Sequence, residues 1–326
     1  MKYLVLSLLF VSSTSVGAMD YTEREEVKAF VKELAAAESF DEKELLSIFA
    51  HAEYKQKIID AISHPTERVL NWSQYQDIFL TDRRVAGGLK FLRENRRALA
   101  AAGEKYGVPP VIITAIIGVE TMYGRITGGY RVLDALVTLS FDYPPRSRFF
   151  RGELKHFVLL AREEKQMITD LTGSYAGAMG LGQFIPSSYR AYAVDFDGDG
   201  FRDIWNNPTD AIGSVANYLA KHGWQRDGQV TLAVEGEAIP EEVFNVSLKP
   251  SKSVGELRRL GLQEASLGPE EMVSPMRLEG KEGDEFWLGL KNFHVITRYN
   301  HSKLYAMAVY QLSEDLSEAA AKLASR

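Results

Sequence analysis

The stretch Gly118-Val119-Glu120-Thr121-Met122-Tyr123-Gly124-Arg125 decides how this chain is interpreted. It closes an almost purely apolar run that starts after Pro109-Pro110 and continues through Ile117. Proline is tolerated in a first helical turn and glycine suits a helix C-cap, so the run predicts a short helix that ends near Gly124. A helix that is apolar on nearly all sides is a buried helix. Glu120 is therefore expected near the end of a buried helix.

A carboxyl group in that position is unfavourable unless it is paired or protonated. Burial raises the pKa of a carboxyl group, and a carboxylic acid that keeps its proton near neutral pH can act as a general acid. The alternative is a structural ion pair between Glu120 and Arg125 or another arginine. On this stretch alone both interpretations stay open.

The composition narrows the protein class. The chain has 326 residues, 45% of them apolar, a net charge of −6 and no cysteine. This length allows two domains or one large multi-lobed unit with a real core. The absence of a basic stripe argues against nucleic acid as a partner. Without disulfides, an exported protein of this kind must be held together by its core or by a metal.

The first residues show the pattern of a secretory signal peptide. Met1-Lys2 precedes an apolar stretch over residues 3–11, and small residues end at Val16-Gly17-Ala18. This predicts a signal peptide over residues 1–18, cleaved near Ala18, with an apolar core too short to span a bilayer. The alternative is an ordinary buried N-terminal helix. Because no cysteine is available to carry a lipid, we expect a periplasmic protein without a membrane anchor.

The rest of the chain predicts helices first and a mixed segment later. Helical spacing of apolar residues predicts helices over residues 25–37, after the N-cap Asp41, and over 134–141 and 148–166. A further helix is expected to open at Thr81-Asp82, to run through Ala100 and to end at Gly103. Residues 228–290 change character, with short strands expected at 230–234, 243–248 and 285–290 and a short helix at 253–260. A last helix is expected over 303–317.

An acidic loop in the middle of the chain predicts a metal site. Asp195, Asp197 and Asp199 alternate ahead of Gly200, as at the start of an EF-hand calcium loop. The twelfth position should be glutamate but is Asn206, so another ligand is needed, and Asp210 is the nearest candidate. Three alternating aspartates would repel one another without a cation. The alternative is a solvated acidic turn.

Three motifs resemble one family closely. They are Gly118-Val119-Glu120-Thr121-x-Tyr123-Gly124, then Ala176-Gly177-Ala178-Met179-Gly180-x-Gly182-Gln183-Phe184-x-Pro186-Ser187, then Ile296-Thr297-Arg298-Tyr299-Asn300. In this order they resemble the B family of lytic murein transglycosylases, in a soluble, non-lipidated form. The resemblance covers nearly the whole mature chain.

The resemblance implies a mainly α (α+β) fold with a lysozyme-like core. It implies a helical domain over residues 19–103, a catalytic core with an EF-hand-like calcium loop over 104–227, a small α+β insertion over 228–290, and a return segment over 291–326 that completes the groove and ends in a helix. Structural Ca²⁺ and no cofactor for chemistry are implied. The implied partners are peptidoglycan glycan strands and other cell-wall enzymes.

The resemblance also implies residue roles. Glu120 matches the single catalytic acid. The residues matched to substrate binding are Tyr75, Tyr123, Arg146, Ser174, Gln183, Phe184, Tyr218, Tyr299, Asn300 and Tyr305. The residues matched to the calcium site are Asp195, Asp197, Asp199, the Phe201 carbonyl and Asp210. One arginine of an expected pair is Pro145 here, which leaves Arg146 alone and puts one contact to the substrate in doubt.

The chemistry agrees with a single acid. Most glycosidases use two carboxylates, and no second acid accompanies Glu120 in its motif. A lytic transglycosylase cleaves the bond between N-acetylmuramic acid and N-acetylglucosamine without water and forms a 1,6-anhydro sugar, with one glutamate as acid and then base. Two alternatives stay open: a muramidase-type hydrolase with an unplaced aspartate, and an inactive peptidoglycan-binding protein. The sequence leaves endo or exo cleavage and oligomeric state undetermined.

Overall fold

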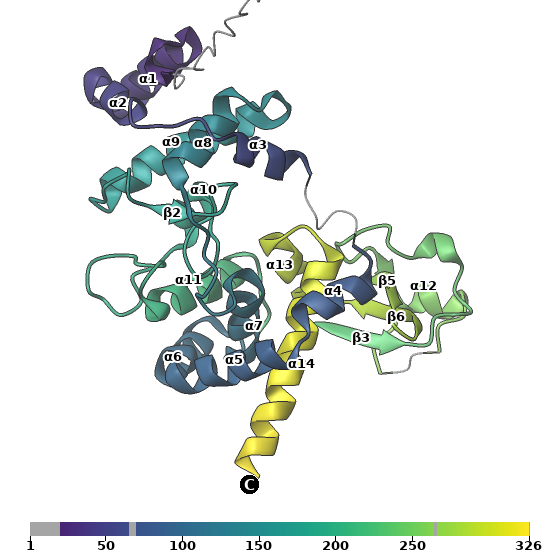
Figure 1. The fold of residues 1–326 in the computed structure, drawn as a ribbon. Coiled ribbons are helices and arrows are strands. Elements are labelled where there is room, and N and C mark those ends of the chain that lie inside the picture. The colour runs from purple at the N-terminus through teal and green to yellow at the C-terminus, as the bar shows by residue number, and fades with distance from the viewer. Residues whose placement is uncertain (1–19, 65–69, 264–265, 326) are drawn as a thin grey trace, which may run out of the picture.

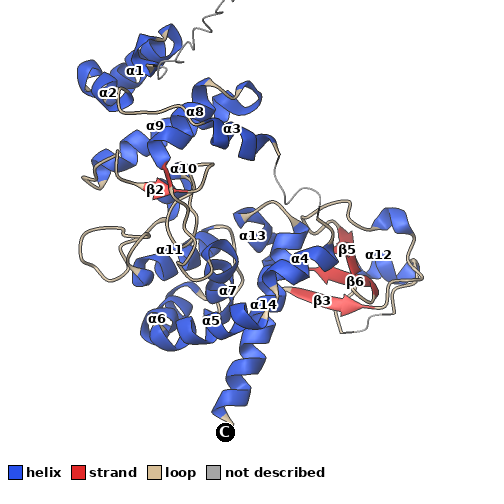
Figure 2. Ribbon diagram, viewed as in Figure 1, coloured by secondary structure: helices blue, strands red, loops and turns tan. Residues whose placement is uncertain are grey.

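The computed structural model describes residues 20–64, 70–263 and 266–325, so the predicted signal peptide lies outside the described residues. The described chain is mainly helical with a small β-containing part, as predicted (Figure 2). The α-helices are α1 (Glu25–Glu38), α2 (Glu42–Phe49), α3 (Gln56–Ser63), α4 (Trp72–Phe79), α5 (Asp82–Glu94), α6 (Arg96–Tyr106), α7 (Pro110–Thr121), α8 (Val132–Phe141), α9 (Ser147–Glu163), α10 (Pro186–Tyr192), α11 (Pro208–Lys221), α12 (Val254–Arg259), α13 (Lys291–Tyr299) and α14 (Lys303–Ala324). The strands are β1 (Tyr130–Arg131), β2 (Thr172–Gly173), β3 (Thr231–Val234), β4 (Lys252–Ser253), β5 (Met272–Gly280) and β6 (Gly283–Gly289), and short 3₁₀ helices occur at η1 (Tyr21–Glu23), η3 (Pro144–Arg146) and η4 (Glu241–Val243).

Helix α7 lies at the centre of the larger part of the molecule (Figure 1). It packs against α5, α6, α11 and α14, and residues 112–119 are all buried. Pro110 occupies its first turn, and Met122 caps it in the left-handed conformation with φ 51°. The predicted buried helix is confirmed. Its observed C-cap, Met122, lies two residues before the expected cap, Gly124.

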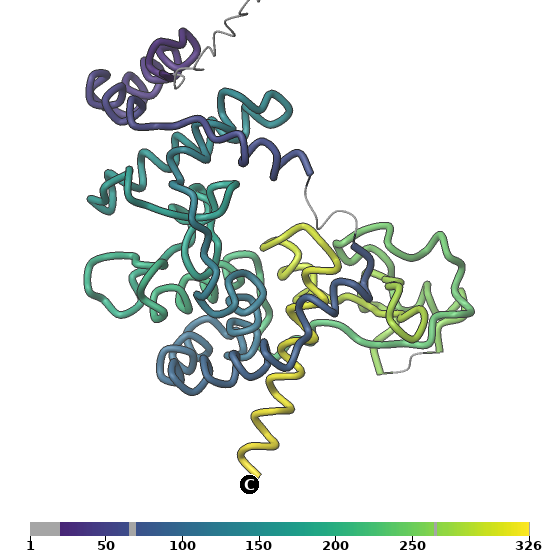
Figure 3. The backbone as a smooth tube through the Cα atoms, viewed as in Figure 1, coloured from purple at the N-terminus to yellow at the C-terminus, as the bar shows by residue number. Residues whose placement is uncertain are grey.

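The N-terminal helices fall into two packing groups. Helix α3 packs on α8, and the η1 segment is tied to the end of α8, where Tyr21 and Arg24 hydrogen-bond Asp142 at 2.6 and 2.7 Å. Helices α4 to α6 pack instead with α7, α11 and α14, on the other side of the molecule (Figure 3). The range predicted as one helical domain therefore contributes helices to two separate packing groups.

Two helix predictions differ in detail. The helix expected over residues 81–103 is interrupted at Asn95, whose backbone leaves the helical region with φ −107° and ψ 20°. The second half, α6, continues past Gly103 and is capped by Gly107 at φ 74°.

None of the helices in the described part of the chain has both the length and the apolar character needed to cross a bilayer.

The mixed segment forms an antiparallel sheet in the order β3-β6-β5-β4. The strands expected at 230–234 and 285–290 are confirmed as β3 and β6. The strand expected at 243–248 is wrong, because Asn245 has a left-handed backbone with φ 60° that interrupts extended structure. Strand β5 was not predicted, because Pro275 within it is atypical of a central strand.

A separate small core supports this sheet and includes Val254, Leu257 and Leu288. Helix α4 packs against β5, and the Trp72 indole donates a hydrogen bond to Glu285 of β6 at 3.2 Å. The sheet is thereby held beside the helices that carry the candidate site.

Candidate active site and metal site

Glu120 lies in the last turn of α7 and is half-buried, whereas the eight residues before it are buried. The hydroxyl of Tyr305, on α14, donates a hydrogen bond to Glu120 Oε1 at 2.7 Å. The next residue, Thr121, holds the helix end in place because its hydroxyl donates to the Leu181 carbonyl at 2.9 Å. The carboxyl group is thus oriented by contacts to two other segments of the chain.

Two tyrosines face this carboxyl group. The rings of Tyr299 and Tyr305 stack with centroids 6.4 Å apart and planes 8° apart. Burial, and after it the negative charge of Glu120, raises the pKa of both phenols well above the usual value. Both phenols therefore remain protonated at physiological pH and act as hydrogen-bond donors: Tyr305 to Glu120, and Tyr299 to the Gly182 carbonyl at 2.6 Å.

The aromatic cluster continues on one side of Tyr299. Phe184 and Tyr218 lie with ring centroids 5.9 and 4.8 Å from that of Tyr299. Both are buried, and Tyr218 donates to the Arg298 carbonyl at 2.5 Å. Burial raises the pKa of Tyr218 to about 12. The structure therefore brings together four of the predicted aromatic residues: Phe184, Tyr218, Tyr299 and Tyr305.

Tyr75 reaches the same region from α4. It is buried between Trp72 and Phe79, with its ring centroid 4.5 Å from that of Phe79. Helix α4 packs against α14, the helix that carries Tyr305.

The glycine-rich segment after β2 is held in shape by its own polar side chains. Gln183 has a left-handed backbone with φ 52°, and its side-chain amide donates to the carbonyls of Thr127 and Gly180 at 3.1 and 2.9 Å. The Ser174 hydroxyl accepts from the backbone N–H of Ala178 at 3.1 Å. These bonds position the loop beside Glu120; contact of either side chain with substrate stays a prediction.

Arg84 was not singled out from the sequence, yet it holds the end of the Glu120 helix. Its guanidinium donates to the carbonyl oxygens of Gly118 and Val119, in the last turn of α7. The side chain is buried, which lowers its pKa, and the positive charge lies at the negative end of the helix dipole. The sequence does contain a signal for Arg84, because its spacing places it on the same face of α5 as Gly88 and Phe91, and that face is buried.

The side chain of Tyr123 is packed against α5 and α7. Its hydroxyl donates to the Arg84 carbonyl at 2.8 Å. Its ring fills the space beside Gly87, Gly88 and Gly118, where a β-carbon would lie within 3.0 Å of it. These contacts give no support to the substrate-binding role predicted for Tyr123.

Arg146 and Asn300 lie at the ends of two other helices, before α9 and after α13. The Arg146 guanidinium lies over the Phe149 ring, 4.3 Å from its centroid, in η3 before α9. Asn300 ends α13 in an extended conformation directly after Tyr299 and is half-buried. Its position is compatible with the predicted contact to substrate, which stays a prediction.

Three of the predicted metal ligands converge. Carboxylate oxygens of Asp195, Asp197 and Asp210 lie within 4.8 Å of one another. Asp210 is fully buried and accepts from the backbone N–H groups of Phe196 and Asp203 at 2.7 and 2.8 Å. Burial raises its pKa, and the charge of Asp197 adds to this effect. Such crowding of carboxylates around a buried one is relieved by a cation.

Asp199 is placed differently. Its carboxylate accepts from the backbone N–H of Phe201 at 2.9 Å and is not one of the three converging groups. Asp195 accepts from three backbone N–H groups of the loop, and these bonds, led by that from Gly200, lower its pKa. The loop is therefore folded around Asp195. The side chains that could bind a metal in this loop offer only oxygen atoms as ligands, as a hard cation requires.

Comparison with known proteins identifies a family. Residues 22–314 match the family model described as a transglycosylase SLT domain. The chain is 42% identical to the membrane-bound lytic murein transglycosylase B of Escherichia coli (strain K12) over 307 residues, which cover 90% of this chain and 83% of that protein.

Two solved structures are similar over almost the whole chain. The catenated lytic transglycosylase SltB1 from Pseudomonas aeruginosa has a TM-score of 0.88 and 50% identity, covering 92% of this chain and 99% of that one. The Escherichia coli lytic transglycosylase Slt35 in complex with calcium has a TM-score of 0.85 and 41% identity, covering 94% of this chain and 98% of that one.

Proposed function

The chain belongs to the transglycosylase SLT domain family, and from this membership we propose that Glu120 is the single acid–base group of its reaction. The protein is a lytic murein transglycosylase, a glycan lyase that acts on peptidoglycan and forms 1,6-anhydro ends without using water. Its fold is that of its solved relatives, with a lysozyme-like core. The observation that carries the assignment of Glu120 is its place at the end of a buried helix, oriented by the Tyr305 hydroxyl.

The proposed reaction has two proton transfers. Glu120 gives its proton to the oxygen that links N-acetylmuramic acid to N-acetylglucosamine, and the bond from muramoyl C1 to that oxygen breaks. The substrate's acetamido group stabilises the positive charge that develops at C1. The muramoyl C6 hydroxyl then attacks C1, and its proton passes to Glu120, which restores the acid.

The surroundings of Glu120 favour this scheme over hydrolysis. Glycosidases that use water position a second carboxylate near the acid. The motif that contains Glu120, residues 118–125, has no second carboxylate. Analysis of the products from purified sacculi tests the proposal, because hydrolysis leaves reducing muramic acid ends.

We propose the remaining predicted residues as the walls of the glycan groove. Phe184, Tyr218 and Tyr299 form a cluster of aromatic rings in contact with one another, and Tyr75 lies on α4. Aromatic walls and a few polar groups are typical of ligand sites. Substitution of Asn300 or Arg146 is the way to decide whether these more distant groups contact substrate.

We propose that the acidic loop binds one structural calcium ion through Asp195, Asp197 and Asp210, with Asp199 and the Phe201 carbonyl completing the site. The three converging carboxylates and the calcium complex of a relative support this proposal. The ion would neutralise the buried Asp210 and join the loop to the start of α11. It would have no part in the chemistry.

Chelation of calcium is expected to lower the melting temperature. A ligand that binds only the folded state at 100 times its Kd adds about 2.7 kcal/mol of stability. We expect Asp197→Ala to abolish the difference between chelator and added calcium, whereas Asp315→Ala on α14 should retain it. Identical melting curves for the parent protein with chelator and with calcium would leave the loop as an acidic turn.

We propose export to the periplasm with cleavage near Ala18, on the basis of the first residues of the sequence. Sequencing of the N-terminus of protein recovered from a periplasmic extract is expected to begin at or near Met19. Recovery of an intact Met1 in that extract would contradict it. Association with other cell-wall enzymes stays a prediction.

A further inference from the structure

The backbone of Leu181 joins the acidic loop to the end of the helix that carries Glu120. Its N–H donates to the Ile204 carbonyl at 2.9 Å, and its carbonyl accepts from the Thr121 hydroxyl at 2.9 Å. The same hydroxyl accepts from the backbone N–H of Gly124 at 3.0 Å, just past the helix end. Leu181 and Thr121 are both buried, so water does not compete for these bonds. A single residue therefore lies between the loop and the neighbour of Glu120.

Ile204 is held by the same bonds that shape the predicted metal site. The residue before it, Asp203, donates its backbone N–H to the Asp210 carboxylate at 2.8 Å. The Asp203 side chain accepts from the backbone N–H groups of Trp205 and Asn206 at 3.0 and 2.9 Å. The backbone is thus fixed on both sides of Ile204, and one of these bonds ends on the buried carboxylate of the metal site.

Gly180 shows how closely the glycine-rich segment approaches the loop. Its backbone is left-handed with φ 69°, and a β-carbon at this position would lie 2.5 Å from the Ile204 carbonyl oxygen. Only glycine fits there, because a real β-carbon does not approach an oxygen so closely. Since a close-packed interior transmits displacement, a shift of Ile204 has to move the segment that contains Leu181.

We propose that Thr121 and Leu181 are positioning residues through which the acidic loop sets the place of Glu120. The inference rests on the proposed function. Repulsion among the converging carboxylates loosens the loop when no cation is bound, and the bonds of Leu181 pass this change to the end of α7. A displacement of about 1 Å of a catalytic group can lower turnover about 100-fold. A cation in the loop therefore raises turnover without touching substrate or exchanging a proton.

The test measures kcat on soluble, uncross-linked glycan strands, below the melting transitions of the calcium-bound and the chelated protein. For the parent protein, kcat with calcium should exceed kcat with chelator at least about fivefold, the lower end of typical coupling between two sites, while KM changes little. Thr121→Val keeps the shape of the side chain but removes the hydroxyl. It should lower kcat in calcium and bring the ratio of the two kcat values close to one. Thr121→Ser keeps the hydroxyl and should restore both.

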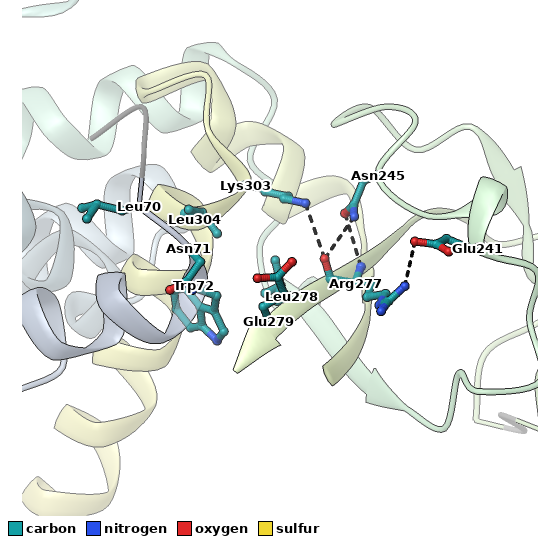
Figure 4. A pocket seen from close by; sticks show the side chains of 10 residues that line it. All are labelled: Leu70, Asn71, Trp72, Glu241, Asn245, Arg277, Leu278, Glu279, Lys303 and Leu304. Carbon is teal, nitrogen blue, oxygen red and sulfur yellow. Dashed lines mark hydrogen bonds and ion pairs between the residues drawn. The ribbon is translucent and has the colours of Figure 1, made fainter. Parts of the chain in front are cut away.

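A cavity of about 400 Å³ between α4, strand β5 and the start of α14 provides the matched control (Figure 4). On its wall, Asn245 joins two segments as Thr121 does. Its side chain donates to the Arg277 carbonyl at 3.0 Å and accepts from the Arg277 N–H at 3.3 Å. These bonds end on β5 and not on the acidic loop. Asn245→Ala should therefore leave the ratio of kcat with calcium to kcat with chelator unchanged.

Amide hydrogen exchange follows the same contacts in the parent protein, without substrate or variant. On chelation, the Leu181 amide should exchange at least about fivefold faster, because its acceptor belongs to the acidic loop. The Phe184 amide bonds the Met179 carbonyl at 2.9 Å within the glycine-rich segment and should keep its rate.

Three results would each overturn the inference: equal kcat with calcium and with chelator, a Thr121→Val protein that still responds to calcium, or an unchanged exchange rate at Leu181. Failure of the proposed function looks different, because the parent protein would then release no 1,6-anhydro products. In that case the exchange rate of the Leu181 amide still decides whether the loop is coupled to the end of α7.

Discussion

Glu120→Gln is expected to abolish release of 1,6-anhydro products while the fold and glycan binding persist. The amide has nearly the shape of the acid and can accept the Tyr305 hydrogen bond through its oxygen. It can neither give a proton to the leaving oxygen nor take one from the C6 hydroxyl. General acid–base groups contribute about 10²–10⁴-fold, and here one residue serves both steps, so the loss should reach the upper end or beyond.

The measurement is turnover of purified sacculi alongside the melting temperature of the same preparation. A structural glutamate would show the opposite pattern, with lower stability and normal turnover of the protein that remains folded. Glu104→Gln, on the exposed side of α6, is the matched control and should change neither quantity. Near-normal turnover by a folded Glu120→Gln variant would falsify the assignment.

Arg84→Met is expected to have the largest effect on stability. It removes the guanidinium donor from the Val119 carbonyl, and from the Gly118 carbonyl it removes one of two donors, because the Met122 backbone N–H also bonds that oxygen. An unsatisfied buried group costs about 1–3 kcal/mol, so the free energy of unfolding should fall by about that amount. Because these carbonyls precede Glu120 directly, turnover of the folded variant should fall as well.

Arg83→Met is the matched control, since Arg83 is the preceding residue and is exposed. Chemical denaturation of both variants gives the comparison, and Arg83→Met should stay within about 0.5 kcal/mol of the parent protein. If Arg84→Met were as stable as Arg83→Met, the contacts at the end of α7 would not be what holds the catalytic helix in place.

The buried helix and its acid could be predicted because both depend on local sequence. The apolar run before Glu120 has no polar face, so its helix must be buried, whichever segments of the chain pack against it. The aspartates of the metal loop were predictable for the same reason, because their spacing is local. The convergence of Tyr299 and Tyr305 on Glu120 came from the resemblance to a family, since these residues lie far apart along the chain.

The features that were missed depend on distant contacts. Arg84 reaches Gly118 across 34 positions of sequence, and no local pattern indicates which carbonyls it will bond. Strand β5 contains Pro275, and its extended conformation is stabilised by pairing with β6. Leu181 bonds both Ile204 and Thr121, and its local sequence indicates neither contact.

The central claim is that bond cleavage uses the substrate's own hydroxyl and no water. The most direct test digests purified sacculi with the protein in water labelled with heavy oxygen and measures the masses of the released muropeptides. We expect every new muramic acid end to be a 1,6-anhydro ring without label. Reducing ends that carry the heavy oxygen would contradict the claim, because they would show that water, activated beside Glu120, attacks C1.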